Sequence, residues 1–118
     1  MKTLDDIFNE KQQLFIELNI PQNQYLELHK KLKLYKVADE LCDISEGSYV
    51  RYINNKTLKL YNGGIVLSVD INDNETGCII KCKNVANHKI FCICIKNNIV
   101  FQKISEDELL ILTILTKK

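Results

Sequence analysis

The spacing of the apolar residues changes near residue 47, and this change constrains the fold more than any other feature of the chain. Before it, apolar residues recur three, four and seven positions apart, as on one face of a helix. After it, apolar and polar residues alternate, as in strands that bury one face. Acids, serine and glycine stand at the change, in residues 43–47, and are typical of a turn. The sequence therefore predicts an α+β protein with helices first and strands after them.

Two helices are predicted in residues 1–45. The first begins at the capping residue Thr3, has Asp6 near the positive end of its dipole, and runs from about residue 4 to residue 18. Pro21 separates it from a second helix, and the short link predicts a helical hairpin. The apolar stripe of the second helix contains Tyr25, Leu28, Leu32 and Tyr35, continued by Val37, Ala38 and Leu41. This stripe either shields part of the core or forms a dimer or docking surface, as in short coiled coils.

Five short strands are predicted in residues 46–104. They cover about residues 48–53, 65–71, 77–83, 89–95 and 99–104. Asn62-Gly63-Gly64 predicts a turn, because glycine tolerates positive φ, and a second turn is expected at residues 72–75. Large apolar residues at 65, 67, 69 and 71 predict a half-buried central strand. Such strands with short links predict a small, bent antiparallel barrel that buries Tyr49 or Val50, Ile65, Leu67, Val69, Ile80, Phe91 or Ile93, and Val100 or Phe101.

A C-terminal helix is predicted in residues 105–118, because Ser105 and Glu108 match a capping box. Residues 109–115 are apolar on nearly every side, so we expect this helix to be buried or to cover an apolar surface of this chain or of a partner. The β-branched residues in the run leave a sixth strand as the alternative. Together with Tyr25, Leu28, Leu32 and Tyr35, the residues expected to contact a protein partner are Leu110, Leu112 and Leu115.

The net charge of +1 argues against a strong phosphate-binding surface, which normally needs a cationic excess. Acids occupy the N-terminus where a signal peptide has its apolar core, and no apolar run reaches the length of a membrane span. We therefore expect an intracellular, reducing location, where thiols stay free.

The five cysteines are Cys42, Cys78, Cys82, Cys92 and Cys94. With His88, the last four could supply a tetrahedral zinc site, and a hairpin turning near residues 85–86 would place Cys78 opposite Cys94. Residues two or four apart along a strand are, however, ~7 or ~13 Å apart, too far to share one ion without a bend. Cysteines that fill the core are the favoured interpretation, with a zinc site or a disulfide as the alternatives, and we expect no metal.

No catalytic motif stands out. Asp70, Asn72 and Asn74 resemble the opening of a calcium loop, but the glycine and glutamate that such a loop needs are replaced by Glu75 and Lys81. The two histidines, His29 and His88, have no recognisable nucleophile motif beside them, and there is neither a phosphate-binding loop nor a dinucleotide fingerprint. We expect no enzymatic activity and no cofactor.

The strand aromatics allow a second type of function. They could form a cage for a methylated lysine or a platform for bases, or they could fill the core. These residues are Tyr49, Tyr52, Tyr61, Phe91 and Phe101.

Three short motifs carry a resemblance to a known group of proteins. They are Gly47-Ser48-Tyr49-Val50-Arg51-Tyr52-Ile53, the segment from Leu60 to Asp70 with its glycine pair, and Asn98-Ile99-Val100-Phe101-Gln102-Lys103. Over residues 46–104 the chain resembles small proteins of nucleocytoplasmic large DNA viruses. The lopsided use of 15 Lys against one Arg, with 16 Ile and 12 Asn, agrees with an A+T-rich source. The resemblance implies an SH3-like barrel in a structural or assembly protein of the virus particle.

Gly64 to Asp70 is also similar to the second strand of Sm-like RNA-binding rings, which have an N-terminal helix as well. Lys96-Asn97 stands where that family has Arg-Gly, and Asp73-Asn74 is offset from its base-contacting position.

The sequence thus predicts three parts: a helical hairpin (1–45), a five-stranded SH3-like barrel (46–104) and a C-terminal helix (105–118). We expect a non-catalytic protein-interaction protein, a minor component of a virus particle, that binds other subunits or itself and no membrane. The alternative is a Sm-like or Tudor-like barrel that binds nucleic acid or a modified peptide.

Overall fold

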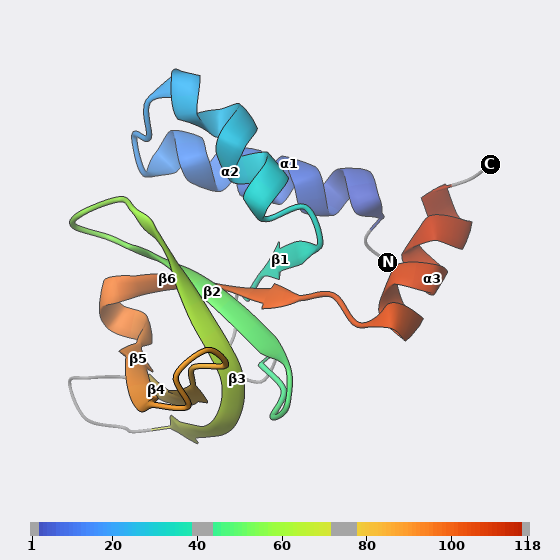
Figure 1. Cartoon of the computed structure of the whole chain (residues 1–118). Coiled ribbons are helices and arrows are strands. Elements are labelled where there is room, and N and C mark those ends of the chain that lie inside the picture. Colours follow the sequence, from blue (N-terminus) through green and yellow to red (C-terminus); the bar gives the residue numbers. More distant parts are fainter. Residues whose placement is uncertain (1–2, 39–43, 72–77, 117–118) are drawn as a thin grey trace. The chain divides into compact units, whose positions relative to one another are not determined.

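Figure 1 shows the computed structural model of the chain, which describes residues 3–38, 44–71 and 78–116. The predicted turn at residues 72–75 lies outside the described residues, as do Leu41, Cys42 and Asp43. The elements are α1 (Leu4–Glu17), η1 (Gln22–Gln24), α2 (Tyr25–Lys31), β1 (Tyr35–Val37), β2 (Tyr49–Asn54), β3 (Leu60–Ile71), β4 (Cys78–Lys83), β5 (Ile90–Cys94), η3 (Ile95–Asn97), β6 (Asn98–Lys103) and α3 (Glu106–Thr116).

The protein is α+β, as predicted. Its strands have the sheet order β1-β6-β2-β3-β4-β5, so the described residues contain six strands and not the predicted five. The additional strand is β1, which the sequence pattern assigned to the second helix. Residues 109–115, for which a strand was the alternative, belong to helix α3. No helix among the described residues is long and apolar enough to cross a membrane.

The chain divides into two compact units. Unit 1 consists of Met1–Val37 and Lys103–Lys118, and unit 2 consists of Ala38–Gln102. Unit 1 therefore contains the three α-helices of the described residues and is built from both ends of the sequence, while unit 2 contains most of the sheet.

Helix α1 begins as the sequence predicts. The Thr3 side chain accepts a hydrogen bond from the Asp6 N–H at 3.2 Å, and the Asp6 carboxylate accepts one from the Thr3 N–H at 2.9 Å. This reciprocal capping box satisfies two backbone donors that the helix itself leaves unpaired. Helix α1 ends at Glu17, one residue before the predicted end.

Helix α2 is shorter than predicted. It ends at Lys31, and Tyr35 and Val37 lie in strand β1. The local three-four spacing of apolar residues fits a helix here, but backbone partners from a distant segment favour a strand. In unit 1 the Leu34 carbonyl accepts a hydrogen bond from the Ile104 N–H at 2.7 Å.

Aromatic side chains join α1 to α2 in unit 1. His29 of α2 stacks on Phe8, with ring centroids 4.1 Å apart, and is tilted against Phe15 at 5.0 Å. Phe15 also contacts Tyr25, and it is completely buried. A second apolar cluster in the same unit contains Ile7, Ile104 and Leu112, with Leu4 and Leu109 packed against it. Helix α3 thereby packs against the N-terminal half of α1 through Leu109 and Leu112.

The strands of unit 2 form an antiparallel meander. Strand β3 pairs with β2 and β4, β4 also pairs with β5, and β6 pairs with the other edge of β2. Its core contains Val50, Val66, Ile80, Ile93 and Val100 together with Ile44 and Cys82. Ile80 is buried as predicted, Val50 and Ile93 are the buried members of their predicted pairs, and Val100 and Phe101 are both buried. Ile65 and Val69, also predicted to be buried, are half-buried.

Strand β3 is irregular, and the irregularity changes which residues face the core. The pairing with β4 slips between Val66 and Ser68, so the alternation reverses there. As a result Val66 is buried, whereas Leu67, predicted to be buried, is 38% exposed. Tyr49 is exposed, and the buried member of that predicted pair is Val50.

The glycine pair lies inside β3 and not in a turn. Gly63 is the extra residue of a bulge, because the pairing with β2 runs from Val50–Gly64 to Arg51–Asn62. A Cβ on Gly63 would lie 2.2 Å from the Val50 carbonyl oxygen, and one on Gly64 would lie 2.1 Å from that of Lys83. Close approach of neighbouring backbones, and not positive φ, is therefore what requires glycine at these positions.

Candidate functional site

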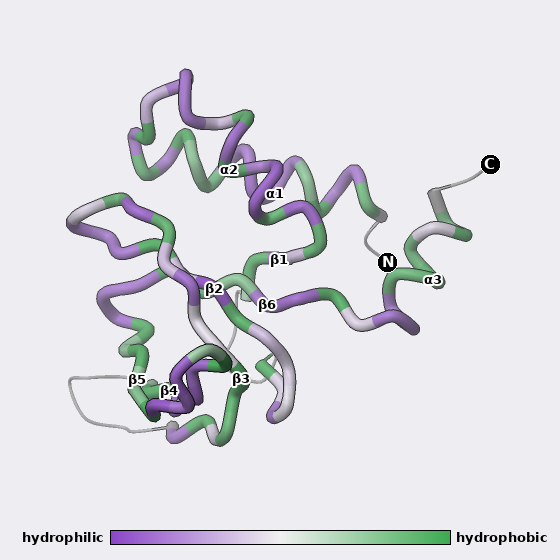
Figure 2. Tube along the Cα trace, in the orientation of Figure 1, coloured by the Kyte–Doolittle hydropathy of each residue, from purple (hydrophilic) through white to green (hydrophobic). Residues whose placement is uncertain are grey.

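The α3 helix presents three large apolar side chains to solvent. Leu110 is 62% exposed, Ile111 51% and Ile114 63%. Ile114 lies four residues after Leu110 and three after Ile111, so it is a surface neighbour of both, and most of the helix is hydrophobic (Figure 2). Of the predicted contact residues in this helix, Leu110 is exposed, Leu112 is buried in the cluster with Ile7 and Ile104, and Leu115 is half-buried.

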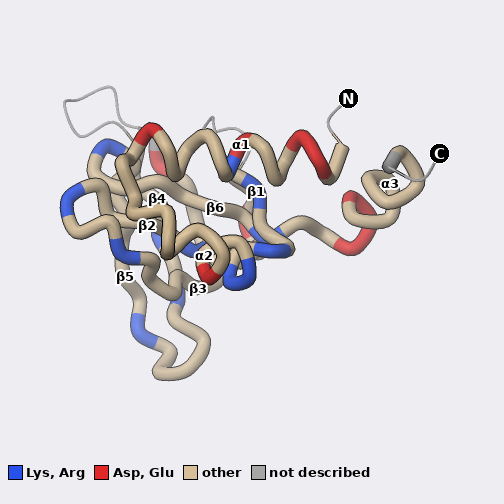
Figure 3. The backbone as a smooth tube through the Cα atoms, turned by 90° about the horizontal axis from the view of Figure 1, so that it is seen from above, with Lys and Arg blue, Asp and Glu red and all other residues tan. Residues whose placement is uncertain are grey.

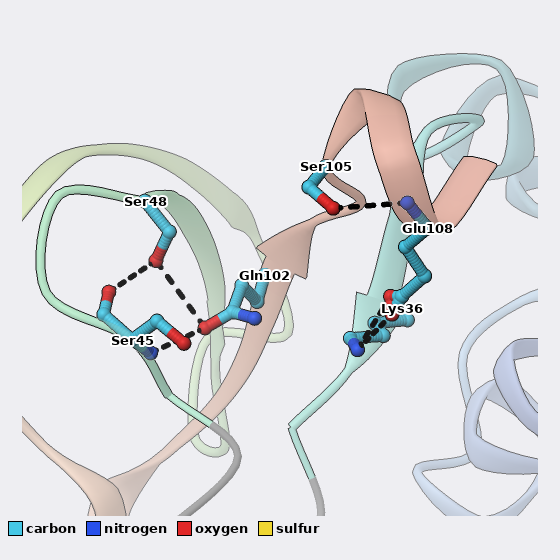
Figure 4. A network of polar contacts seen from close by, with 6 residues as sticks. All are labelled: Lys36, Ser45, Ser48, Gln102, Ser105 and Glu108. Carbon is cyan, nitrogen blue, oxygen red and sulfur yellow. Dashed lines mark hydrogen bonds and ion pairs between the residues drawn. The ribbon is translucent and has the colours of Figure 1, made fainter. Parts of the chain in front are cut away.

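The start of α3 is fixed by polar contacts within unit 1 (Figure 4). The Ser105 hydroxyl accepts a hydrogen bond from the Glu108 N–H at 3.1 Å, which confirms Ser105 as the predicted N-cap. The Glu108 carboxylate accepts hydrogen bonds from the Lys36 ammonium, one of them at 2.8 Å. These contacts hold the first turn of α3 in place, and the exposed apolar residues follow it in the same helix.

A separate polar cluster in unit 2 holds the segment before β2 (Figure 4). The side-chain oxygen of Gln102, a buried residue, accepts hydrogen bonds from the Ser45 N–H at 2.8 Å and the Ser48 hydroxyl at 3.2 Å. These two donors satisfy the side-chain oxygen of a buried glutamine, so the cluster has a structural explanation.

The predicted contact residues of the second helix are mostly covered. Leu28 is 8% exposed and Leu32 is completely buried, while Tyr25 is half-buried beside Phe15. Tyr35, also half-buried, lies in β1 and not in the helix. These four residues therefore do not form an exposed stripe, because the apolar face of α2 packs inside unit 1.

Two tyrosines of unit 2 form a partly exposed pair. Tyr52 and Tyr61 lie opposite each other on β2 and β3 and stack with centroids 5.3 Å apart, at 19° between their planes. The Tyr61 hydroxyl is 3.3 Å from that of Thr57. Burial, with smaller effects from Tyr61 and Cys82, raises the pKa of Tyr52. Among the other strand aromatics, Phe101 is buried and Phe91 packs partly against the core.

The thiols of β4 and β5 lie on different faces of the sheet. Cys94 is opposite Ile79, one residue from the predicted partner Cys78, and Cys92 is opposite Lys81. Cys78 and Cys82 are buried, whereas Cys92 is exposed. The described residues contain no group of three or more His, Cys, Asp or Glu that could hold a metal ion. Cys78 and Cys82 thus behave as the core cysteines that the sequence predicted.

Unit 1 contains a buried ammonium group that the sequence analysis missed. Lys11 is only 3% exposed, and its Nζ donates a hydrogen bond to the Leu32 carbonyl at 2.7 Å. Burial lowers the pKa of Lys11, and burial followed by the charge of Lys11 lowers that of His29. A signal was present, since Lys11 follows Ile7 and Phe8 at helical spacing and precedes Leu14 and Phe15 on the apolar face.

His29 has one hydrogen-bond partner for two ring nitrogens. Its Nε2 lies 2.7 Å from the Gln12 amide oxygen, which can only accept, so Nε2 carries the proton. The Nδ1 atom is buried and has no hydrogen-bond partner. When the His29 ring is neutral, Nδ1 is therefore an acceptor without a hydrogen-bond donor, and the ring is affected by the charge of Lys11.

Comparison with known proteins does not assign the chain to a family. No protein-family model, curated protein or solved structure matches it.

Proposed function

We propose that this chain is a non-catalytic protein-interaction protein whose α3 helix docks onto a partner subunit. The observation that carries the proposal is the exposed face of α3, formed by Leu110, Ile111 and Ile114. An amphipathic helix that lays apolar residues spaced one turn apart into a groove is a recurrent mode of recognition. Unit 2 adds a second docking element, since β5 is the last strand of the sheet order and its Ile90 is 57% exposed.

We also propose that unit 2 is an SH3-like barrel and that α1 and α2 form a helical hairpin. Strands β2 to β5 form a meander, and β6, which comes last in the chain, returns to pair with β2, as in small antiparallel barrels. The bulges in β3 supply the bend that closure of so small a sheet needs. The single turn η3 connects β5 to β6.

The α3 proposal is tested with full-length chain carrying Leu110→Glu and Ile114→Glu. Both positions are exposed, so the fold should remain intact, while self-association measured by light scattering or retention of the bound partner in affinity purification should fall about tenfold or more. Leu26→Glu is the matched control, because Leu26 is a leucine of unit 1 with 69% exposure that lies outside α3. Wild-type protein that is monomeric and retains no partner would contradict the proposal.

The viral setting rests on the motif resemblance of residues 46–104 to small proteins of large DNA viruses. If the chain is a minor structural or assembly component, mass spectrometry of purified particles should recover it in a fixed ratio to the major capsid protein. Recovery only from infected-cell lysate, and never from particles, would contradict this part of the proposal.

The second candidate function is recognition of a methylated lysine by a Tudor-like barrel, and the stacked pair Tyr52 and Tyr61 favours it. Aromatic faces bind a desolvated quaternary ammonium through cation–π attraction. In an NMR titration, a trimethyllysine peptide should bind more tightly than its unmethylated form, Tyr61→Ala should abolish the difference, and Tyr61→Phe should keep it. Steeply salt-dependent binding of labelled RNA or DNA would instead favour the Sm-like alternative.

A further inference from the structure

Unit 1 contains a cavity whose wall combines apolar side chains with cationic groups. Its volume is about 440 Å³, near the lower end of the ~300–1,000 Å³ typical of small-molecule sites. Lys11, His29 and Lys33 line it, and Asp5 is the one acid among the lining residues. The remaining lining residues are apolar: Leu4, Ile7, Phe8, Leu34, Ile104 and Leu109.

The charges at this wall are not balanced within the described residues. Neither Lys11 nor Lys33 forms an ion pair there, and the buried ammonium of Lys11 has one protein acceptor for its three N–H groups. Two lysines against one aspartate leave an excess of positive charge even when His29 is neutral. Figure 3 shows the Lys residues along α2 and the following segment, and acids in the first turns of α1 and α3. A buried cation without a counter-charge is costly, so an anion at this wall would be stabilised.

The apolar part of the wall limits what that anion can be. A small, strongly hydrated ion such as inorganic phosphate would lose water and gain no contact with the aliphatic side chains. A molecule with one anionic group and an apolar body would bury that body against Leu4, Ile104 and Leu109 and place its charge at the lysines. The cavity volume suits one compact molecule of this kind.

We propose that the cavity of unit 1 binds a small carboxylate with an apolar chain, such as a medium-chain fatty acid. Lys11 and Lys33 bind the carboxylate, and the apolar wall holds the chain. His29 lies beside the carboxylate, which favours the protonated ring; Nδ1, unpartnered in the free protein, then becomes a donor. Unit 1 would then bind a small ligand in its cavity, in addition to the proposed docking of α3 on a partner.

The probe is octanoate, added to full-length ¹⁵N-labelled protein and followed by NMR and calorimetry. We expect saturable binding with shifts at the amides of Lys11, His29, Leu34 and Leu109, and a higher pKa of the His29 imidazole in the bound state. Octanol, which has the same chain without the charge, should bind about tenfold or more weakly, because a charge-assisted hydrogen bond is lost. Octylammonium should bind no better than octanol.

Two substitutions at exposed lining residues give opposite predictions. Lys33→Gln should weaken octanoate binding about threefold to tenfold, and Asp5→Asn should strengthen it by about twofold to fivefold, because each changes the charge next to the carboxylate. Lys30→Gln is the matched control: it removes one lysine charge three residues before Lys33, at a residue of α2 that does not line the cavity, and affinity should stay the same. Lys11→Met, which retains the volume of the side chain, should reduce binding further than Lys33→Gln.

The proposal would be overturned if octanol bound as tightly as octanoate, or if Lys33→Gln and Asp5→Asn both left the affinity unchanged. Shifts confined to residues 44–102 would also overturn it, since they would place the ligand in unit 2. A folded Lys33→Gln protein is expected, because Lys33 is exposed, so these outcomes do not depend on whether the Lys11 variant folds.

Discussion

Gly63 and Gly64 mark the places where β3 comes closest to the backbones on either side of it. The Cβ positions at the two glycines would lie 2.2 and 2.1 Å from carbonyl oxygens of β2 and β4. These oxygens belong to the backbone, so they cannot rotate away as a flexible side chain would. Only glycine at position 63 therefore lets the bulge lie so close to the backbone of the core residue Val50.

Gly63→Ala should lower the free energy of unfolding by about 2–3 kcal/mol, because the added methyl group forces the strands apart. Urea unfolding of the full chain is the measurement. Gly47→Ala is the control: Gly47 has φ of +84° but nothing within 4 Å of its Cβ position, so only the backbone strain of about 1 kcal/mol applies. Equal losses for the two variants would contradict the close-approach explanation.

Cys82 makes unit 2 sensitive to alkaline pH. Burial, with a smaller effect from Cys92, raises the pKa of the Cys82 thiol from 9.0 to about 11. Between these values the unfolded chain releases the proton while the folded chain keeps it, so stability should fall as pH rises from 9 towards 11. The raised pKa values of Cys78 and Tyr52, both due mainly to burial, act in the same direction.

Urea midpoints measured across this pH range test the effect. Cys82→Ala should be less stable near neutral pH but lose less stability on going to high pH than the wild type. Ile80→Val, also in the core of β4, should lower stability by a similar amount at every pH, because it removes no titratable group. A Cys82→Ala slope as steep as that of the wild type would refute the role of this thiol.

At the scale of elements, the helix starts were the most predictable feature. Thr3 and Ser105 cap α1 and α3 as their local sequence indicates, because capping depends on residues within one turn. The end of α2 was not predictable in this way. The residues from Tyr25 to Tyr35 keep helical spacing, yet the Leu34 carbonyl is paired with the N–H of Ile104, which is remote in sequence.

Strand β3 also combines features that the local sequence predicts with features that depend on remote partners. Its existence follows from the apolar residues that alternate along it, but its two bulges come from partner strands, so the predicted inward position of Leu67 was wrong. Three of the residues expected to contact a partner, Leu28, Leu32 and Leu112, are buried, and for Leu112 the cluster includes Ile7, which is remote in sequence. Lys11 was not predicted as a buried residue, although the sequence places its charge on the apolar face of the first helix.

The capping box of α1 offers a test at this scale. Thr3→Ala should lower the stability of unit 1 by about 1 kcal/mol, because it leaves the Asp6 N–H without its acceptor. Hydrogen exchange of the α1 amides should report the loss, and Thr3→Ser should restore most of it. Unchanged exchange in Thr3→Ala would show that the cap does not limit the opening of this helix.

At the scale of the whole molecule, the two units differ in how they are built from the sequence. Unit 2 is one continuous stretch, whereas unit 1 needs residues from both ends. In its cluster Ile7 of α1 is buried together with Ile104 and Leu112. Loss of the C-terminal segment should therefore affect the two units unequally.

A chain that ends at Gln102 should lose the packed helices of unit 1 and keep the sheet of unit 2. Two-dimensional NMR would then show dispersed amide signals for residues 44–71 and 78–102 and collapsed signals for α1 and α2. The shortened chain lacks Ile104 and Leu112, which are buried with Ile7, so α1 loses the packing that stabilises it. The far-ultraviolet circular dichroism of helix should therefore decrease as well. Retention of all α1 signals in the shortened chain would contradict this division of the molecule.

The split composition of unit 1 also has a consequence during translation. The ribosome makes α1 first, but Ile104 and Leu112, which cover Ile7, emerge only after every strand has been produced. Until then the part of α1 around Ile7 lacks the apolar residues that bury it in the finished chain. A premature stop before Ile104 would leave Ile7 in that state, so the loss of one end of the chain would be felt at the other end.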